Sequence, residues 1–268
     1  MTRTQASRDS TSHGSTHDDS PFPASAAPPT LVAVAHGSRE PEALRTVTAL
    51  LAAVRARRPG LRVELGHIEL NAPLLGDTLA ALPRGGRAIL VPLLLGRGYH
   101  VRQDLPDAMA AAPRQATGLA APLGPHPLLA EVLRDRLRET GRGSAFDAVV
   151  LAAAGSRDPD SAVDANRMAA LLSARLGGVP VLPGYASAAS PTVGEAVARL
   201  RERGHRRIAL ASYFTAPGLF AARCTREAPG LTAAPLGAHP ALARLVLHRY
   251  DEAASSVRGD GLAVAQRH

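Results

Sequence analysis

The amino-acid sequence predicts an α/β fold of two similar units, each a doubly wound parallel sheet, that face a central cleft. Short apolar runs alternate with segments of helical periodicity, and the chain matches itself in three blocks. The matching blocks are residues 31–41 with 149–159, 66–82 with 184–200, and 121–129 with 234–242. Because the blocks occur in the same order in both halves, we infer an internal duplication.

Each element of the first unit, residues 31–142, follows from its local pattern. The apolar run 31–35 predicts a buried parallel strand. Pro41, followed by apolar residues at helical spacing, predicts a helix that ends at Pro59-Gly60. The other expected elements of the first unit are strand 61–68, helix 73–82, strand 88–95, helix 103–111 and helix 127–140. The second unit, residues 146–253, repeats the order of the first.

The two ends of the chain are expected to lie outside these units. Residues 1–30 are rich in Ser, Thr, Pro and Asp and predict a disordered tail, and residues 254–268 are expected to form a second tail. The sequence contains neither the apolar core of a signal peptide nor an uninterrupted apolar stretch of about 18 residues. We therefore expect a cytoplasmic protein without a membrane partner.

The charged residues narrow the range of functions. The net charge is +8, and every basic side chain is arginine because the sequence has no lysine, which excludes a Schiff-base lysine and a Walker P-loop. The single cysteine, Cys224, excludes an all-cysteine metal site, so a metal would need histidine and carboxylate ligands. No block of like charges occurs. This spread argues against a nucleic-acid partner and favours an anionic small molecule in a cleft.

Three chemically capable residues occur in the first copy only. The pairs of counterparts are His36 and Ala154, Glu69 and Ser187, and His100 and Phe220. All three first-copy residues follow expected strand ends, where a parallel α/β sheet binds its ligands. Two histidines and a carboxylate bind divalent metals and accept protons near neutral pH. We therefore predict one site, in the first unit, and a degenerate counterpart in the second.

Residues that occur in both copies are expected to be structural in the first place. Gly37, Ser38 and Arg39 recur as Gly-Ser-Arg in the second copy. His126 and His239 each precede a proline that opens an expected helix, which favours a role in a turn or as a helix cap.

The motifs AHGSREP (35–41), IELNAP (68–73) and VPLLLGRGYHVRQDLP (91–106) together resemble those of the sirohydrochlorin chelatases, the class II chelatases of the CbiX/SirB type. The resemblance covers about residues 31–250, and a long form with an internal duplication occurs in that family. It implies two chelatase-like domains with four-stranded sheets. It also implies insertion of Fe²⁺ into sirohydrochlorin for sirohaem, or of Co²⁺ on the cobalamin route, without ATP.

The resemblance also implies roles for individual residues. His36 and His100 match the metal-handling histidines of the family, and Glu69 matches its acidic partner. A base near the ring must accept the pyrrole protons as the metal enters, and arginines suit the carboxylates at the edge of the tetrapyrrole. The candidate substrate-binding residues are Ser38, Arg39, Arg97 and Arg102. No cofactor is implied beyond the substrate metal ion.

Two other functions stay open. A non-catalytic carrier of a tetrapyrrole or metal would use the same cleft, whereas a basic nucleic-acid-binding module predicts steeply salt-dependent DNA binding. The metal is not determined by these residues, because Fe²⁺, Co²⁺ and Ni²⁺ all accept histidine and carboxylate ligands. We expect a monomer, since a duplicated chain supplies both halves of a cleft by itself.

Overall fold

In the computed structural model, the first apolar run of each copy of the repeat forms a fully buried strand. The structure describes residues 28–83, 86–97, 102–112, 116–141, 146–228 and 230–265. Strand β1 (Thr30–Ala35) and its counterpart β5 (Ala148–Ala153) are buried at every position. This is the pattern of a parallel strand that is covered on both faces.

The two sheets have the same topology. The first is ordered β2-β1-β3-β4 and the second β6-β5-β7-β8, and all the strand pairs are parallel. The predicted α/β fold with two four-stranded units is therefore confirmed. Strands β4 and β8 were not among the elements expected from the sequence. The remaining strands are β2 (Val63–His67), β3 (Ala88–Pro92), β4 (Ala116–Leu119), β6 (Val181–Tyr185), β7 (Ile208–Ser212) and β8 (Leu231–Thr232).

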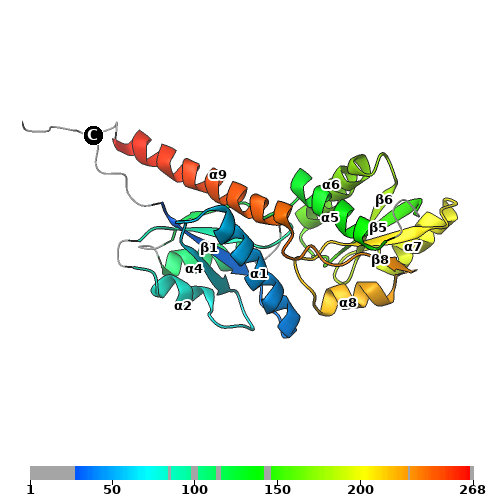
Figure 1. The fold of residues 1–268 in the computed structure, drawn as a ribbon, viewed down its shortest axis with the longest axis horizontal. Coiled ribbons are helices and arrows are strands. Elements are labelled where there is room, and N and C mark those ends of the chain that lie inside the picture. The colour runs from blue at the N-terminus through cyan, green and yellow to red at the C-terminus, as the bar shows by residue number, and fades with distance from the viewer. Residues whose placement is uncertain are drawn as a thin grey trace, which may run out of the picture.

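The helices follow the expected order (Figure 1). Helix α1 (Pro41–Arg57) has proline in its first turn and buries the apolar face predicted from the sequence, apart from Leu44, which is exposed. His126 begins helix α5 as expected of a cap, because its Nδ1 accepts a hydrogen bond from the Leu128 backbone N–H. The other helices are α2 (Leu75–Ala80), α4 (Asp104–Ala111), α5 (Pro127–Glu139), α6 (Pro159–Arg175), α7 (Val193–Glu202), α8 (Leu219–Arg226) and α9 (Pro240–Ala265).

The two units exchange their last helices. Helix α5 belongs to the first copy in sequence but contacts α6 and β7 of the second unit, whereas α9 contacts α1, β3 and β4 of the first unit. Figure 1 shows α9 lying along the first unit and α5 lying beside α6. The division expected at residues 142–146 is therefore a boundary of the duplication in sequence. In space, each sheet is covered in part by a helix of the other copy.

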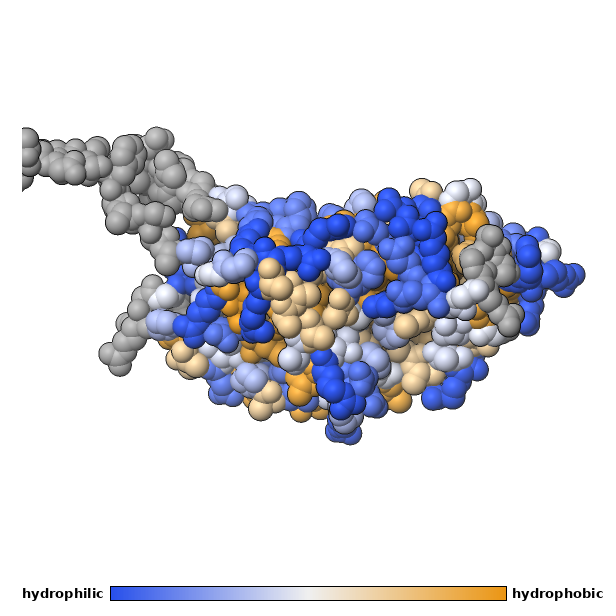
Figure 2. All heavy atoms as spheres, viewed as in Figure 1, coloured by the Kyte–Doolittle hydropathy of each residue, from blue (hydrophilic) through white to orange (hydrophobic). Residues whose placement is uncertain are grey.

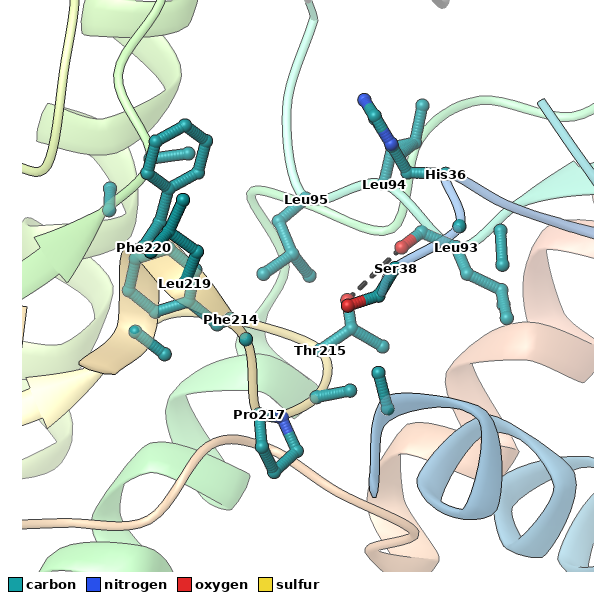
Figure 3. A pocket seen from close by; sticks show the side chains of 18 of the residues that line it. His36, Ser38, Leu93, Leu94, Leu95, Phe214, Thr215, Pro217, Leu219 and Phe220 are labelled. Carbon is teal, nitrogen blue, oxygen red and sulfur yellow. Dashed lines mark hydrogen bonds between the residues drawn. The ribbon is translucent and has the colours of Figure 1, made fainter. Parts of the chain in front are cut away.

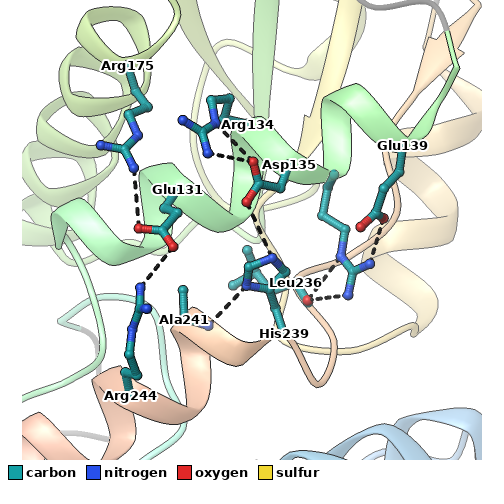
Figure 4. Close-up of polar contacts among 10 residues, drawn as sticks. Glu131, Arg134, Asp135, Glu139, Arg175, Leu236, His239, Ala241 and Arg244 are labelled. Carbon is teal, nitrogen blue, oxygen red and sulfur yellow. Dashed lines mark hydrogen bonds and ion pairs between the residues drawn. The ribbon is translucent and has the colours of Figure 1, made fainter.

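Ion pairs and hydrogen bonds join helix α5 to helices α6 and α9 (Figure 4). The Glu131 carboxylate of α5 pairs with Arg175 of α6 and with Arg244 of α9. Asp135 of α5 lies 3.5 Å from His239 Nε2, and the His239 Nδ1 accepts a hydrogen bond from the Ala241 N–H, so His239 has the expected capping role as well.

The C-terminal tail expected at residues 254–268 is corrected over residues 254–265, and residues 266–268 lie outside the described residues. Helix α9 continues to Ala265, and Ala254 is buried. Val257 packs against the core, and a side chain added at Gly118 of β4 would touch it, so apolar contacts with the first sheet extend the helix. At the other end, Thr30 already belongs to β1, and residues 1–27 of the expected N-terminal tail lie outside the described residues.

The surface is mixed in character. Figure 2 shows hydrophilic side chains over most of the visible face, with apolar residues exposed between them. Within the described part of the chain, no helix combines the length and the apolar character needed to cross a membrane.

Candidate functional site

A cavity of about 1410 Å³ opens between the two units, at the carboxyl ends of their central strands. This is the central cleft expected from the duplication. The loops after β1 and β3 line it from the first unit, and the loops after β5 and β7 line it from the second. In each sheet these are the two adjacent strands at which the chain reverses its direction of winding, which is where doubly wound sheets bind ligands.

The loops after β3 and β7 touch each other at the floor of the cavity. The Thr215 hydroxyl donates to the Leu93 carbonyl oxygen at 3.1 Å, as Figure 3 shows, and the Tyr213 hydroxyl donates to the Leu95 carbonyl oxygen at 2.7 Å. Burial raises the pKa of the Tyr213 phenol, so the group stays protonated and keeps its donor. These two contacts hold the facing units at a defined separation.

His36 and Glu69 come together in the cavity as the sequence predicts. His36 follows β1 and Glu69 follows β2, which pairs with β1. The Nδ1 of His36 lies 3.5 Å from Oε1 of Glu69, with the two side chains 40% and 52% exposed. The backbone joins them as well, because the Glu69 N–H donates to the His36 carbonyl oxygen at 3.0 Å. An imidazole and a carboxylate therefore face open space from neighbouring strand ends.

The close approach of these strand ends depends on Gly37. Its φ is +102°, and a Cβ at this position would collide with the carbonyl oxygen of Glu69. Gly155 repeats this geometry in the second copy with a φ of +85°, where a Cβ would collide with the carbonyl oxygen of Ser187. The Gly-Ser-Arg repeat is thus structural at its glycine, as expected, since only glycine combines positive φ with this contact.

Replacing Gly37 with alanine is expected to destabilise the fold by more than the cost of positive φ alone, which is about 1–2 kcal/mol. The added methyl group must also displace the Glu69 carbonyl. Gly60→Ala is the matched control, because Gly60 has a φ of +86° with nothing within 4 Å of an added Cβ. The free energy of unfolding in urea measures both variants, and equal losses would contradict the role given to Gly37.

His100, the third residue predicted for this site, lies outside the described residues. Among the residues that are described, no group of three His, Cys, Asp or Glu side chains is placed to hold a metal ion. His36 and Glu69 are therefore the part of the predicted metal-handling set that the structure brings together, and the role of His100 stays a prediction.

Ser38 and Arg39 line the cavity next to His36. The Ser38 hydroxyl accepts a hydrogen bond from the Glu40 N–H at the start of α1, and Ser156 does the same for Asp158 before α6. The Ser38 N–H donates to Asn71 Oδ1 at 2.7 Å, a contact that was not predicted although Asn71 lies in the IELNAP motif. Ser38 thus shapes the loop, while Arg39 is exposed at the cavity.

Arg97 and Arg102, expected to bind substrate carboxylates, are instead paired with aspartates of the second unit. Arg97 makes ion pairs with Asp160 and Asp164, and Arg102 makes ion pairs with Asp158 and Asp160. These contacts do not support the expected substrate role. The partners were not visible in the sequence, because they lie about 60 residues away in the other copy.

The second unit contributes an apolar wall, which was not predicted from the sequence. Leu219 is 76% exposed and Phe220 is 42% exposed, and both line the cavity. Figure 3 places them, with Phe214, across the cavity from His36. Large apolar side chains that stay exposed around one concavity mark a ligand-binding surface. Phe220 was noted in the sequence only as the residue that replaces His100 in the second copy.

The comparison with family models decides to which family this fold and cavity belong. The CbiX model matches residues 30–140 and again residues 148–253, which together make up most of the chain. The chain belongs to the CbiX family. The two matches coincide with the two copies found in the sequence, so the long, duplicated form of CbiX is confirmed.

Relatives of this CbiX chain include both one-unit and two-unit proteins. It is 25% identical over 240 residues to a protein of Bacillus subtilis named sirohydrochlorin ferrochelatase. The matched region covers 84% of this chain and 92% of that protein. It is 28% identical over 123 residues to a protein of Methanococcoides burtonii named sirohydrochlorin cobaltochelatase. That matched region covers 41% of this chain and 94% of the archaeal protein. One unit of the CbiX chain therefore corresponds to almost the whole archaeal relative.

A solved structure shows the same fold. SirB from Bacillus subtilis with Fe³⁺ superposes with a TM-score of 0.72 at 24% sequence identity, covering 87% of this CbiX chain and 98% of that chain. The two-unit architecture is therefore shared along nearly the full length of that protein.

Proposed function

We propose that the chain is a sirohydrochlorin chelatase, which inserts Fe²⁺ or Co²⁺ into sirohydrochlorin in the cavity between the units. The observation that carries this proposal is the His36–Glu69 pair at the cavity wall. The second copy has Ala154 and Ser187 at the equivalent places, so the metal chemistry falls to the first unit. The family match and the names of the relatives support the substrate and the reaction.

The cavity suits a large, flat, anionic macrocycle. Its volume of about 1410 Å³ exceeds the roughly 300–1,000 Å³ of pockets for drug-sized ligands. The apolar wall of Leu219 and Phe220 offers a surface for one face of the ring, and His36 lies on the opposite side. A macrocycle between them would present its pyrrole nitrogens to the imidazole and carboxylate.

The insertion reaction requires a metal ligand and a base at the same place. Two N–H protons leave the macrocycle for each divalent ion that enters, so charge is conserved. The His36 imidazole replaces a water of the ion without holding it too tightly, and the Glu69 carboxylate accepts the two pyrrole protons one after the other and passes each to solvent. The exposure of both side chains permits this exchange with water. His100 completes the set by the resemblance alone.

The edge of the macrocycle is assigned to the loop between β1 and α1. The Arg39 guanidinium lies at the cavity next to His36, where it suits a substrate carboxylate by bidentate pairing. The Ser38 hydroxyl already accepts a bond from Glu40 and still has its own proton to donate. We further propose that the chain works as a monomer, because both walls of the cavity come from one chain. We also propose that it is cytoplasmic and uses no other cofactor.

An absorbance titration distinguishes this enzyme from a carrier. Sirohydrochlorin and Co²⁺ or Fe²⁺ are mixed under anaerobic conditions with and without the protein, and the spectrum is followed. The proposal predicts that catalytic amounts of protein accelerate the spectral change of metallation. Stoichiometric binding of sirohydrochlorin with metallation no faster than in buffer would overturn the proposal and favour the carrier.

A further inference from the structure

Leu70, which directly follows Glu69, holds a backbone conformation that leucine rarely adopts. Its φ is +66°, in the left-handed region. The Asn71 N–H donates to the Glu69 carbonyl oxygen at 2.8 Å, so Leu70 is the central residue of a three-residue turn. Such a turn with positive φ is rare and strained. Glycine would adopt it without the crowding that a Cβ causes, yet this position carries a branched apolar side chain.

The residues on both sides of Leu70 are held by the loop that carries His36. The Glu69 N–H donates to the His36 carbonyl oxygen at 3.0 Å. On the other side, Asn71 Oδ1 accepts a hydrogen bond from the Ser38 N–H at 2.7 Å. Because both neighbours are fixed in this way, the turn cannot relax to relieve the strain at Leu70.

The second copy of the repeat has the same conformation with a much smaller side chain. Ala188 occupies the place of Leu70 in the matching blocks 66–82 and 184–200, and its φ is +52°. Positive φ is therefore a property of the fold at this place in both units. Leu70 lines the cavity, whereas Ala188 is not among the described residues that line it. The larger side chain is thus found in the copy in which this turn borders the cavity.

Burial does not offset the strain at Leu70, because its side chain is 52% exposed. Strained residues of this kind cluster at ligand-binding and active sites. Other large apolar side chains are exposed at the same cavity, namely those of Leu44, Leu219 and Phe220. Exposed apolar side chains that gather around one concavity mark a ligand-binding surface. Leu70 therefore has the features of a residue that contacts a ligand.

Leu70 lies on the side of the cavity opposite the apolar wall. A Cβ added at Gly37 would be 3.3 Å from the Leu70 Cβ, so Leu70 lies beside the residue that follows His36. Figure 3 shows His36 across the cavity from Phe220. Apolar side chains therefore line the cavity from both units, with the imidazole and the Glu69 carboxylate next to one of them. A flat ring with two apolar faces fits such a space.

We propose that Leu70 is a substrate-contacting residue, which packs against the face of sirohydrochlorin that is turned toward Glu69. Phe220 would contact the other face. This inference rests on the proposed function. The apolar contact is the same before and during metal insertion, so it strengthens binding of the macrocycle and leaves the chemical step unchanged.

Leu70→Gly tests the proposal, because glycine removes the side chain and the strain together. The Kd for metal-free sirohydrochlorin, measured by absorbance titration, is expected to rise about 5- to 10-fold, since about half of a leucine side chain loses its apolar contact. We expect kcat for Co²⁺ insertion to stay within about twofold of the parental value, and KM to rise. The midpoint of unfolding in urea is expected to rise as well, because positive φ suits glycine.

Ala188→Gly is the matched control, because it makes the same backbone change in the second copy. Its midpoint of unfolding is expected to rise, with the parental Kd for sirohydrochlorin. Two further variants separate apolar character from size. Leu70→Met keeps an apolar side chain and is expected to keep the parental Kd. Leu70→Asn keeps the approximate size, tolerates positive φ and is expected to raise the Kd as glycine does.

An unchanged Kd in Leu70→Gly and Leu70→Asn, or an equal rise in Ala188→Gly, would overturn the proposed contact. A midpoint of unfolding below the parental value in Leu70→Gly would overturn it too, because the leucine would then serve the fold. A loss of kcat at constant Kd would indicate an action through Glu69, against the proposal.

The same titrations separate this inference from the proposed function. If the parental chain binds sirohydrochlorin but does not accelerate metallation, the proposed function fails, and the Kd values of the variants still decide the role of Leu70. If the parental chain metallates sirohydrochlorin and the Leu70 variants bind it like the parent, the inference alone fails. A parental chain that does not bind sirohydrochlorin overturns both.

Discussion

Replacing His36 with alanine is expected to lower kcat for metal insertion at least about 100-fold, which corresponds to about 2.7 kcal/mol of transition-state stabilisation. The His36 imidazole lies across the cavity from Phe220, where we propose that it binds the metal, and the second copy carries alanine at the equivalent position. The fold is expected to be unaffected, because the His36 side chain is exposed to the cavity. The initial rate of the absorbance change measures the effect, and added imidazole is expected to restore part of it.

His205→Ala is the control for His36→Ala. His205 lies before the first residue of β7, whereas the cavity is lined by residues that follow the strand. The His205 Nδ1 lies 3.7 Å from Asp147, and its loss should leave insertion at the parental rate. If His36→Ala also kept the parental rate, the site would be assigned to the wrong residues.

Replacing Glu69 with glutamine is expected to lower kcat by about 10²- to 10⁴-fold, the usual contribution of a general base. Glutamine keeps the size of the side chain but cannot accept a pyrrole proton, so binding of sirohydrochlorin is expected to persist without metallation. Steady-state kinetics with sirohydrochlorin and Co²⁺ separate kcat from KM. The effect should appear in kcat, because the proton transfer occurs only as the metal enters.

The duplication supplies a control at the mirror position of Glu69. Ser187 occupies that place in the second copy and donates from its hydroxyl to the Ala154 carbonyl oxygen at 3.1 Å. Ser187→Ala is expected to retain the parental kcat. Comparable losses in both variants would show that the second unit takes part in the proton chemistry, against the single-site account.

Much of the fold was predictable because the pattern that encodes it is local. Buried strands such as β1 and β5 are uninterrupted apolar runs, and α1 follows proline with apolar residues at helical spacing. Strand β4 was not predicted, because its four residues, Ala-Thr-Gly-Leu, include Gly118 and do not form an apolar run. Leu44 shows the limit of periodicity: it has helical spacing with the core residues of α1 but lines the cavity.

The helix exchange was not predictable from one copy of the repeat. An amphipathic helix carries the same pattern whichever sheet it covers, so nothing in the sequence of α5 or α9 tells which unit it packs on. The extension of α9 beyond residue 253 has the same origin, since it depends on contacts with β4 of the other copy.

The site was predictable where strand pairing is enough to bring residues together. His36 and Glu69 follow adjacent strands, so their meeting needs only the order of the sheet. The engagement of Arg97 depends on how the two units face each other, and no local pattern contains that information. The apolar wall was missed for the same reason: Leu219 becomes a site residue only opposite the first unit.

Single-turnover metallation shows whether the first unit inserts the metal in the shared cavity. The protein is held in excess over sirohydrochlorin, so product release does not limit the rate, and Co²⁺ is added while the spectrum is recorded. We expect the parental chain to convert all the bound sirohydrochlorin faster than buffer does, and we expect His36→Ala to bind it but to metallate it no faster than buffer. Identical time courses for the parental chain and His36→Ala would mean that His36 takes no part in metal insertion.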